Sequence, residues 1–314
     1  MIKIGIIGAG NLAQIAVLPA LKQIDNIELS GIYNRTFEKA QKLAWDFQIP
    51  FCYKDLDQFL IQKYDAVLVL SSPEVHKIHV ISALQAGSHV FCEKPLSTSL
   101  NEVEEMVAIS QKTNKKLMVG FNRRYSPFIS KAKEIFNNIQ VELCSVAKHK
   151  DSLMKRGLLI DAIHYVDLMR WFCGGKVNYV SAVAEYEDPW IEKTLTATMK
   201  FSTGAIGTLL MNRSSGQWLE ISEFHGGKKS VIIDYPKKIE VITSCKREYF
   251  DFKTKDWSWA INMPWLTGFV QQFEHFFRCI ESGEEVLTSG SDALLTHQLV
   301  HQIYTSAGLP GLED

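Results

Sequence analysis

A glycine-interrupted apolar run at the start of the chain constrains the fold more than any other feature. The stretch KIGIIGAGNLAQ, residues 3–14, reads as a buried strand, a short loop and the first turns of a helix. Gly8 permits a tight turn, Gly10 leaves room for a phosphate against the backbone, and Ala13 allows the helix to pack closely on the strand. We therefore predict a dinucleotide site here, with a purely structural turn as the alternative. The residues expected to line it are Gly8, Gly10, Asn11, Leu12 and Ala13.

The end of the second expected strand bears on the choice of dinucleotide. A site that prefers NAD usually carries Asp or Glu there, which binds the ribose 2′-hydroxyl. This chain has Asn34 followed by Arg35, so no carboxylate would repel a 2′-phosphate and a guanidinium is present to pair with it. We predict a preference for NADP over NAD. The alternative is that Arg35 is a solvated surface residue beside a site that accepts NAD.

Short β-rich runs alternate with helical segments from Met1 to about Phe121. Continuous apolar strands between helices indicate a parallel sheet that is covered on both faces. We predict a doubly wound α/β domain over residues 1–121. Its strands are expected at 2–7, 27–33, 50–53, 66–70, 89–94 and 116–121, and its helices at 11–24, 36–47, 76–86 and 101–113.

The periodicity changes after Arg124. In residues 194–201 apolar side chains alternate with Thr and Lys, which is typical of an antiparallel strand with one packed face. Residues 202–204, Ser-Thr-Gly, predict a hairpin turn. We predict a second α/β domain over residues 122–314, with a boundary that rests on the change of period alone. Further strands are expected at 205–212, 218–224, 229–235 and 238–243, and helices after Pro127, around His164 and at 268–282 and 291–306.

Composition excludes several classes of partner. The formal net charge is -1, so no overall charge attracts the chain to nucleic acid or to an anionic membrane. No apolar run reaches the length of a membrane span, and residues 1–7 lead directly into a strand rather than a signal peptide. The six cysteines are scattered without a CxxC pair, which favours reduced thiols in a cytoplasmic protein. No cluster has metal-ligand spacing, so we predict no metal site.

Several motifs together resemble the glucose–fructose oxidoreductase/inositol dehydrogenase (Gfo/Idh/MocA) family. They are GIIGAGNLAQ, SSPEVH, AGSHVFCEKPLS, GFNRRYSP, DAIHYVDLMRW and FVQQFEHFFRCIESGE, and they extend over nearly the whole chain. The resemblance implies a Rossmann domain followed by an α/β domain with an open, largely antiparallel sheet. It also implies NAD(P)-dependent redox chemistry on a sugar, polyol or related small molecule, and a homo-oligomer that forms through the open sheet.

The resemblance assigns a role to Lys94 in the EKP motif. Lys94 follows an expected strand, and ligands bind outside the carboxyl ends of such strands. It would hold the substrate or act in catalysis, next to the nicotinamide, while Glu93 belongs to the same cofactor loop. Without the family, a lysine just after a strand is more often a solvated terminus.

The resemblance also places a catalytic histidine at His164, where a satisfied core histidine is the alternative. Family members usually carry Asp four residues earlier, but that position is Ile160 here and the acid is Asp161. Asp161 would act in proton transfer, bind a substrate hydroxyl or cap its own helix. Tyr165 would hydrogen-bond a sugar or serve in packing.

Other candidates carry weaker signals. Ser71, Ser72 and His76 match the family's cofactor-contacting strand end, although His76 would equally begin the next helix. Asn122 is expected near the nicotinamide. Arg123 would hold the substrate or brace the domain junction. The aromatic residues Trp257, Trp259 and Trp265 would form a sugar-stacking wall or a hydrophobic anchor.

Three functions remain open on this basis. The first is an NAD(P)-dependent dehydrogenase or reductase acting on a CH–OH or carbonyl group. The second is a redox-silent NAD(P)-binding regulator, because the acid is displaced and the catalytic helix lacks a glycine-rich lead-in. The third is a glycosidase that uses bound NAD without consuming it. Hydride exchange with a substrate panel separates the first two.

Overall fold

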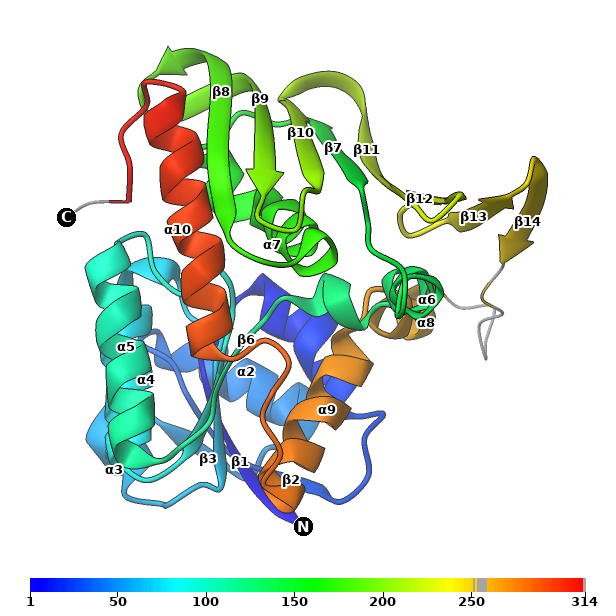
Figure 1. Cartoon of the computed structure of the whole chain (residues 1–314). Coiled ribbons are helices and arrows are strands. Elements are labelled where there is room, and N and C mark those ends of the chain that lie inside the picture. The colour runs from blue at the N-terminus through cyan, green and yellow to red at the C-terminus, as the bar shows by residue number, and fades with distance from the viewer. Residues whose placement is uncertain (251, 253–258, 313–314) are drawn as a thin grey trace. The chain divides into compact units, whose positions relative to one another are not determined.

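The computed structural model describes residues 1–250, 252 and 259–312, and at 259–261 it describes the backbone only (Figure 1). The described residues form two compact units, and each contains separate stretches of sequence. Residues 1–122 and 259–294 belong to the first unit, whereas residues 123–250, 252 and 295–312 belong to the second.

A six-stranded sheet forms the centre of the first unit. Its strand order is β3-β2-β1-β4-β5-β6, and every neighbouring pair is parallel. Residues Ala66–Val69 are all fully buried, as expected of a strand covered on both faces. The predicted doubly wound sheet is confirmed. The strands are β1 (Ile2–Ile7), β2 (Ile27–Tyr33), β3 (Phe51–Tyr53), β4 (Ala66–Val69), β5 (His89–Cys92) and β6 (Leu117–Val119).

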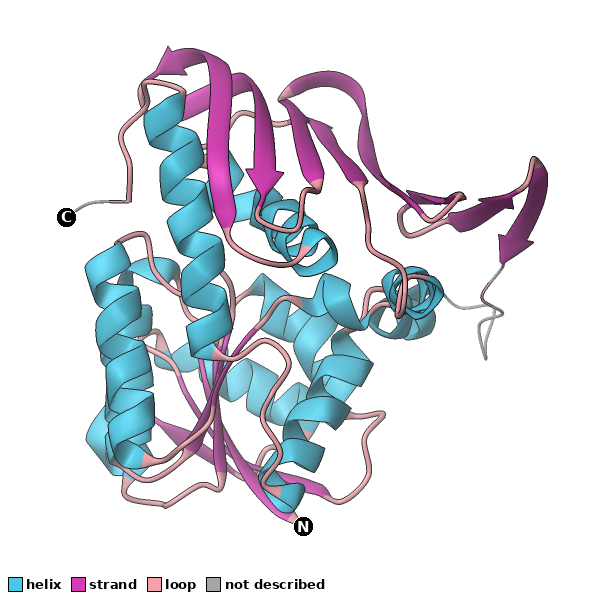
Figure 2. Cartoon of the chain, in the orientation of Figure 1, coloured by secondary structure: helices cyan, strands magenta, loops and turns pink. Residues whose placement is uncertain are grey.

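Helices lie on both faces of this sheet (Figure 2). Local signals set several of their ends: the Ser99 side chain accepts a hydrogen bond from Glu102 N, and Asn114 ends that helix with a φ of 52°. The first helical segment, which begins at Asn11, contains a π-turn. The elements are η1 (Ala13–Val17), α1 (Leu18–Leu21), α2 (Phe37–Phe47), α3 (Leu56–Leu60), η2 (Pro73–Val75), α4 (His76–Gln85), α5 (Leu100–Thr113), α8 (Trp259–Leu266) and α9 (Phe269–Ser282).

The segment 259–294 joins the first unit, whereas the sequence analysis placed all residues from 122 onward in a second domain. The apolar face of α9 explains the difference. Phe273 and Phe276 lie with their ring centroids 4.7 and 6.2 Å from that of Phe91 in β5. Periodicity identifies such a face but does not say which sheet it covers.

An eight-stranded sheet forms the centre of the second unit. Its order is β14-β13-β12-β11-β7-β10-β9-β8, and only the β7–β10 pair is parallel. The predicted open, largely antiparallel sheet is therefore confirmed. The strands are β7 (Leu143–Asp151), β8 (Val177–Asp188), β9 (Ile191–Phe201), β10 (Ile206–Asn212), β11 (Ser214–Gly226), β12 (Lys229–Asp234), β13 (Lys238–Thr243) and β14 (Lys246–Phe250).

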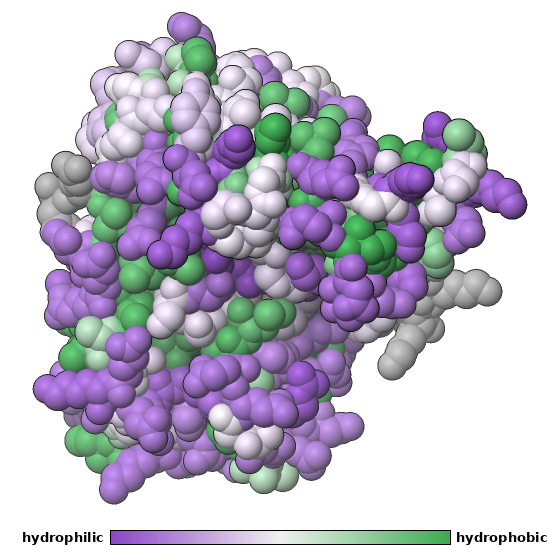
Figure 3. Space-filling view, in the orientation of Figure 1, coloured by the Kyte–Doolittle hydropathy of each residue, from purple (hydrophilic) through white to green (hydrophobic). Residues whose placement is uncertain are grey.

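The alternation in β9 corresponds to burial, as the sequence predicts. Leu195, Ala197, Met199 and Phe201 are all buried, whereas Thr196, Thr198 and Lys200 are exposed. Helix α7 packs against β7 and β10. On the face drawn in Figure 3, hydrophilic residues predominate and hydrophobic ones form separate patches. The remaining helical elements are η3 (Asn122–Tyr125), α6 (Pro127–Ile135), η4 (Leu158–Ala162), α7 (Ile163–Cys173) and α10 (Gly290–Ser306).

Candidate active site

A pocket lies at the carboxyl ends of β1, β2, β4 and β5 in the first unit. It collects most of the residues that the sequence analysis assigned to a cofactor, and it also contains Tyr33, Val75 and His79, which that analysis did not select. The predicted residues that line it are Gly8, Gly10, Asn11, Leu12, Asn34, Arg35, Ser71, Ser72, Glu93 and Lys94. Ala13 is fully buried instead, consistent with close packing of the helix on the sheet.

Positions 8 and 10 favour glycine for different structural reasons. Gly8 has a φ of +110°, and a Cβ there would lie 2.7 Å from the carbonyl carbon of Leu70. Gly10 is exposed, and a Cβ on it would meet no atom within 4 Å. Gly8 thus serves the turn itself, whereas the absence of a side chain at Gly10 keeps the pocket open.

The Asn34 side chain braces the loop between β1 and the first helix. Its Oδ1 accepts a hydrogen bond from Ala9 N at 3.0 Å, and its Nδ2 donates to Thr36 O at 2.8 Å. Arg35 is exposed at the rim of the pocket. The amide therefore supports the loop, and the neighbouring guanidinium faces solvent beside it.

These features fit a dinucleotide. The first N–H groups of a helix have no acceptor within the helix, and here that helix begins at Asn11 directly behind the open Gly10. Such groups, with the helix dipole, favour a phosphate. The pyrophosphate would lie against residues 8–12, and the ribose of the adenosine would lie near Arg35.

We expect Gly10→Val to weaken binding of NAD and NADP by about a hundredfold or more, equivalent to one or two charge-assisted hydrogen bonds. The added side chain would project into the open space where a pyrophosphate must approach. Thermal unfolding should be nearly unchanged, and Gly10→Ala should give a smaller loss. Isothermal titration measures the affinity. Gly8→Ala is the contrasting variant, because its strained φ and close contact should reduce stability. Undiminished binding by Gly10→Val would contradict this assignment.

Two histidines in α4 have different positions relative to the pocket. His76 is buried; its Nδ1 lies 3.0 Å from Pro95 O and its Nε2 lies 2.9 Å from Ser71 O, so it links two loops. His79 lines the pocket, and its Nδ1 lies 2.9 Å from Ser71 Oγ. Burial, with a contribution from His76, lowers the pKa of His79 to about 4, so this ring is neutral near pH 7.

Lys94 lies beside Glu93 at the end of β5 and lines the same pocket. Its backbone N donates to Glu93 Oε2 at 3.3 Å. Glu93 is buried, and a Cβ on Gly120 would lie 3.0 Å from its carboxyl group, so Gly120 makes space for this side chain. Asn122 is also buried in the first unit, where its Nδ2 donates to Thr267 O at 2.8 Å; it does not line the pocket.

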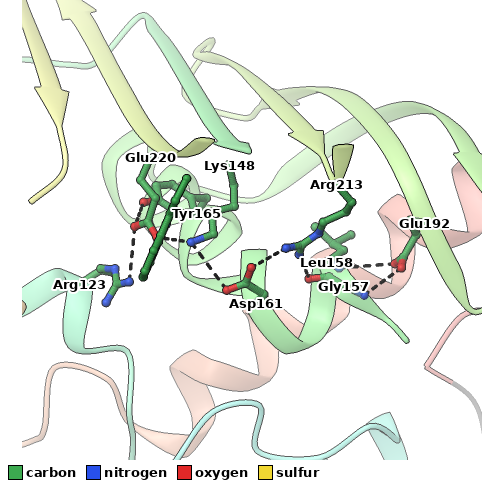
Figure 4. A network of polar contacts seen from close by, with 10 residues as sticks. Arg123, Lys148, Gly157, Leu158, Asp161, Tyr165, Glu192, Arg213 and Glu220 are labelled. Carbon is green, nitrogen blue, oxygen red and sulfur yellow. Dashed lines mark hydrogen bonds and ion pairs between the residues drawn. The ribbon is translucent and has the colours of Figure 1, made fainter. Parts of the chain in front are cut away.

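The second unit contains a network of buried charges (Figure 4). Glu220 on β11 is its centre and is only 1% exposed. Its carboxylate accepts hydrogen bonds from Arg123, Lys148, Tyr165 and Trp218. Burial raises the pKa of Glu220, but Arg123 and Lys148 outweigh it and bring the pKa to about 2. Glu220 is therefore ionised at neutral pH.

Asp161 lies in the η4 turn and belongs to the same network. Arg213 donates to its Oδ2 at 2.6 Å, and Lys148 Nζ lies 3.7 Å from its Oδ1 (Figure 4). The Asp161 side chain is 22% exposed, whereas Arg213 and Lys148 are buried. Glu192, rather than Asp161, accepts the amides of Gly157 and Leu158 at the start of the turn.

The other predicted residues of the second unit are placed as follows. His164 lies in the first turn of α7 and is 6% exposed. Tyr165 is buried, and its hydroxyl donates to Glu220; burial and Glu220 raise its pKa well above the usual value. The Arg123 guanidinium lies 4.6 Å from the ring centroid of Tyr235. Arg123, Asp161 and Tyr165 therefore share one network.

Sequence reasoning missed Lys148, Arg213 and Glu220. The available signal was a charge on the apolar face of a strand, since Lys148 follows buried Cys144 and Val146 at even spacing in β7. Buried charges require partners, but the sequence does not show which strands pair. Of the expected aromatic wall, Trp257 and the Trp259 side chain lie outside the described residues, and Trp265 is half-buried.

Two kinds of feature, a metal-binding cluster and a membrane-spanning helix, are absent from the described residues. No three His, Cys, Asp or Glu side chains among them are grouped so that they could hold a metal ion. No helix in the same part of the chain combines the length and the apolar character that crossing a membrane requires.

Comparisons with known proteins agree with this architecture. Residues 2–121 match the GFO_IDH_MocA family model, described as an oxidoreductase family with an NAD-binding Rossmann fold, and residues 148–308 match its C-terminal alpha/beta domain. The chain is 27% identical to myo-inositol 2-dehydrogenase of Thermotoga maritima, covering 92% of this chain and 91% of the relative.

Solved structures are similar over the full length. A dehydrogenase from Clostridium difficile is 27% identical, with a TM-score of 0.87, covering 97% of this chain and 99% of the other. An oxidoreductase from Agrobacterium radiobacter, solved with NAD+, L-tartaric acid and magnesium, is 18% identical with a TM-score of 0.85, covering 98% and 96%. The latter likeness establishes the fold alone.

Proposed function

The chain belongs to the Gfo/Idh/MocA oxidoreductase family, and on that premise we propose that it transfers a hydride between NAD(P) and a sugar, polyol or related small molecule. One observation carries the proposal: the open Gly10 backbone and Lys94 line the same pocket. When bound, the dinucleotide supplies the nicotinamide ring that accepts or gives the hydride.

In the oxidation direction, a substrate CH–OH group loses a hydride from carbon and a proton from oxygen, and becomes a carbonyl. We assign Lys94 to the substrate oxygen, where its ammonium group stabilises developing negative charge. His164 takes the proton as general base. Asp161, oriented by Arg213 and Lys148, accepts a hydrogen bond from a substrate hydroxyl.

A substrate panel tests this function. The purified protein is incubated with NAD or NADP and a series of sugars, cyclitols and acyclic polyols, and formation of the reduced nicotinamide is followed by absorbance. Hydride transfer to or from at least one panel member is the expected result. Tight dinucleotide binding without any transfer would favour a regulator. Bond cleavage without net consumption of cofactor would favour the glycosidase chemistry.

We propose NADP as the preferred dinucleotide, supported by the exposed guanidinium of Arg35 at the pocket rim. Arg35→Ala should weaken NADP binding by roughly ten- to a hundredfold, the cost of one hydrogen bond to a charged group, and leave NAD binding within a fewfold. Titration of both dinucleotides against both proteins gives the ratio. An equal effect on NAD and NADP would remove the argument for a 2′-phosphate contact.

We further propose that copies of the chain associate through the eight-stranded sheet. Exposed apolar residues on its strands support this: Tyr179 is 58% exposed, Val183 70% and Leu210 41%. Sedimentation of the purified protein and of a Val183→Lys variant tests it. A monomeric wild-type protein would contradict association.

A further inference from the structure

An exposed tryptophan is attached to the buried network of the second unit. Trp218 on β11 is 62% exposed, yet its Nε1 donates to Glu220 Oε1 at 2.7 Å. The other donors to Glu220 are less accessible: Lys148 and Tyr165 are buried and Arg123 is half-buried. Trp218 is therefore the member of this network that presents most of its surface to solvent.

Trp218 lies against two lysines of the neighbouring strand β7. Glu220 pairs with Lys148, but the register of β11 with β7 shifts between Ser214 and Leu219, so the position of Trp218 is given by its distances to these lysines. The ring centroid lies 4.8 Å from Lys148 Nζ and 5.5 Å from Lys150 Nζ. These cation–π contacts and the hydrogen bond fix the orientation of the ring.

A contribution to the stability of the folded protein does not explain the charged network beneath Trp218. Replacing buried ion pairs with apolar residues is often neutral or stabilising, so a network of this kind is weak evidence for a stabilising role. A hydrogen bond that holds an exposed indole ring in one orientation does, however, provide a preorganised apolar surface. Large, rigid aromatic rings of this kind are efficient contact surfaces for ligands.

Lys148 lies close both to this ring and to Asp161, the carboxylate that we propose binds a substrate hydroxyl. Its Nζ lies 4.8 Å from the Trp218 ring centroid and 3.7 Å from Asp161 Oδ1, which is partly exposed. A flat apolar surface and a hydroxyl acceptor thus both lie near one buried ammonium group. A molecule with a C–H-rich ring face and hydroxyls at its edge can contact both.

We propose that Trp218 is a specificity-determining residue: its ring stacks against the C–H face of a cyclic polyhydroxylated substrate and selects it over acyclic polyols. This inference rests on the proposed function, because it concerns the part of the substrate that residues of the second unit would bind. Trp218 is not assigned a part in hydride or proton transfer. Its substitution should therefore act on KM rather than on kcat.

The test compares Trp218→Leu and Trp218→Phe with the wild-type protein, using myo-inositol as cyclic and sorbitol as acyclic probe. For the cyclic probe, KM should rise about tenfold in Trp218→Leu, with a smaller rise in Trp218→Phe, which keeps a ring but loses the hydrogen bond. The preference for the cyclic over the acyclic probe should fall in the same order. Trp45→Leu is the matched control, because Trp45 is 84% exposed on α2 and belongs to no proposed site.

A second readout does not depend on turnover. Titrating myo-inositol into the NADP-saturated protein should change tryptophan fluorescence in the wild type and in Trp45→Leu, but not in Trp218→Phe. Hydride transfer with unchanged KM and preference in Trp218→Leu would overturn this inference and leave the proposed function standing. A Trp218-dependent fluorescence change without hydride transfer would overturn the proposed function instead. A change in sedimentation with unchanged KM would assign Trp218 to an interface between copies and also overturn the inference.

Discussion

Replacing Lys94 with methionine is expected to lower kcat by about 10²- to 10⁴-fold, the usual range for loss of a proton-transfer or charge-stabilising group. Methionine keeps the length of the side chain but removes the ammonium group that we assign to the substrate oxygen. Lys94 shares its pocket with residues 8–12, so dinucleotide affinity should stay within a fewfold if the lysine acts on substrate. Single-turnover hydride transfer and a separate binding titration distinguish the two effects.

The control for this variant is Lys77→Met. Lys77 lies on α4 and pairs with Glu105 at 2.8 Å, with the two side chains 38% and 50% exposed, so its loss should leave kcat unchanged. Lys94→Arg should recover little activity, because the guanidinium has a different shape and hydrogen-bond geometry. A Lys94→Met protein with wild-type kcat would show that this lysine takes no part in the reaction.

Glu220→Ala is expected to cost about 3–5 kcal/mol in the free energy of unfolding. The substitution leaves the buried ammonium group of Lys148 and the half-buried guanidinium of Arg123 without their shared carboxylate, and it removes the acceptor of the Tyr165 hydroxyl. Urea unfolding followed by circular dichroism measures the loss. Glu223→Ala on the same strand is the control, because that side chain is 40% exposed, and it should change stability little.

The pH dependence of stability gives a second test of the same carboxylate. The pKa of Glu220 is about 2 in the folded protein, below its value of about 4.5 in the unfolded chain, because Arg123 and Lys148 outweigh burial. Its contribution to stability is therefore fully present above pH ~4.5 and is lost as the pH falls toward ~2. Wild type should lose stability across this range more steeply than Glu220→Gln. Parallel curves would show that folding does not lower the pKa of Glu220.

The parallel sheet of the first unit followed from the sequence because local signals and tertiary packing agree there. The glycine pattern and the apolar run at residues 66–70 predict the same local structures that the sheet requires. The residues of the cofactor pocket could be predicted from the sequence for the same reason. They follow strand ends, and parallel strands bring those ends together. His79 was missed because it lies one helical turn inside α4, where no strand end marks it.

The second unit was less predictable because its candidate site depends on strand pairing. Lys148 and Glu220 come from two different strands, and Arg213 lies in the bend between β10 and β11. Only the register of β7 with β11 places Glu220 opposite Lys148. β8 has mostly exposed or half-buried positions, so it lacks the alternation by which β9 was recognised. The sequence shows that Asp161 is displaced from the family position. Its guanidinium partner Arg213 lies 52 residues away along the chain, so no local sequence pattern predicts the pair.

The brace formed by Asn34 has a consequence for altering cofactor use. An aspartate at this position, the usual route toward NAD, would still accept the Ala9 amide but would set a negative charge against the Thr36 carbonyl, to which Asn34 now donates. A single exchange would thus disturb the turn to which we assign the phosphates while it changed the group near the ribose. Coenzyme selectivity and the geometry of this loop are therefore coupled through one side chain, and redesign toward the other dinucleotide would have to preserve both the acceptor and the donor that Asn34 supplies.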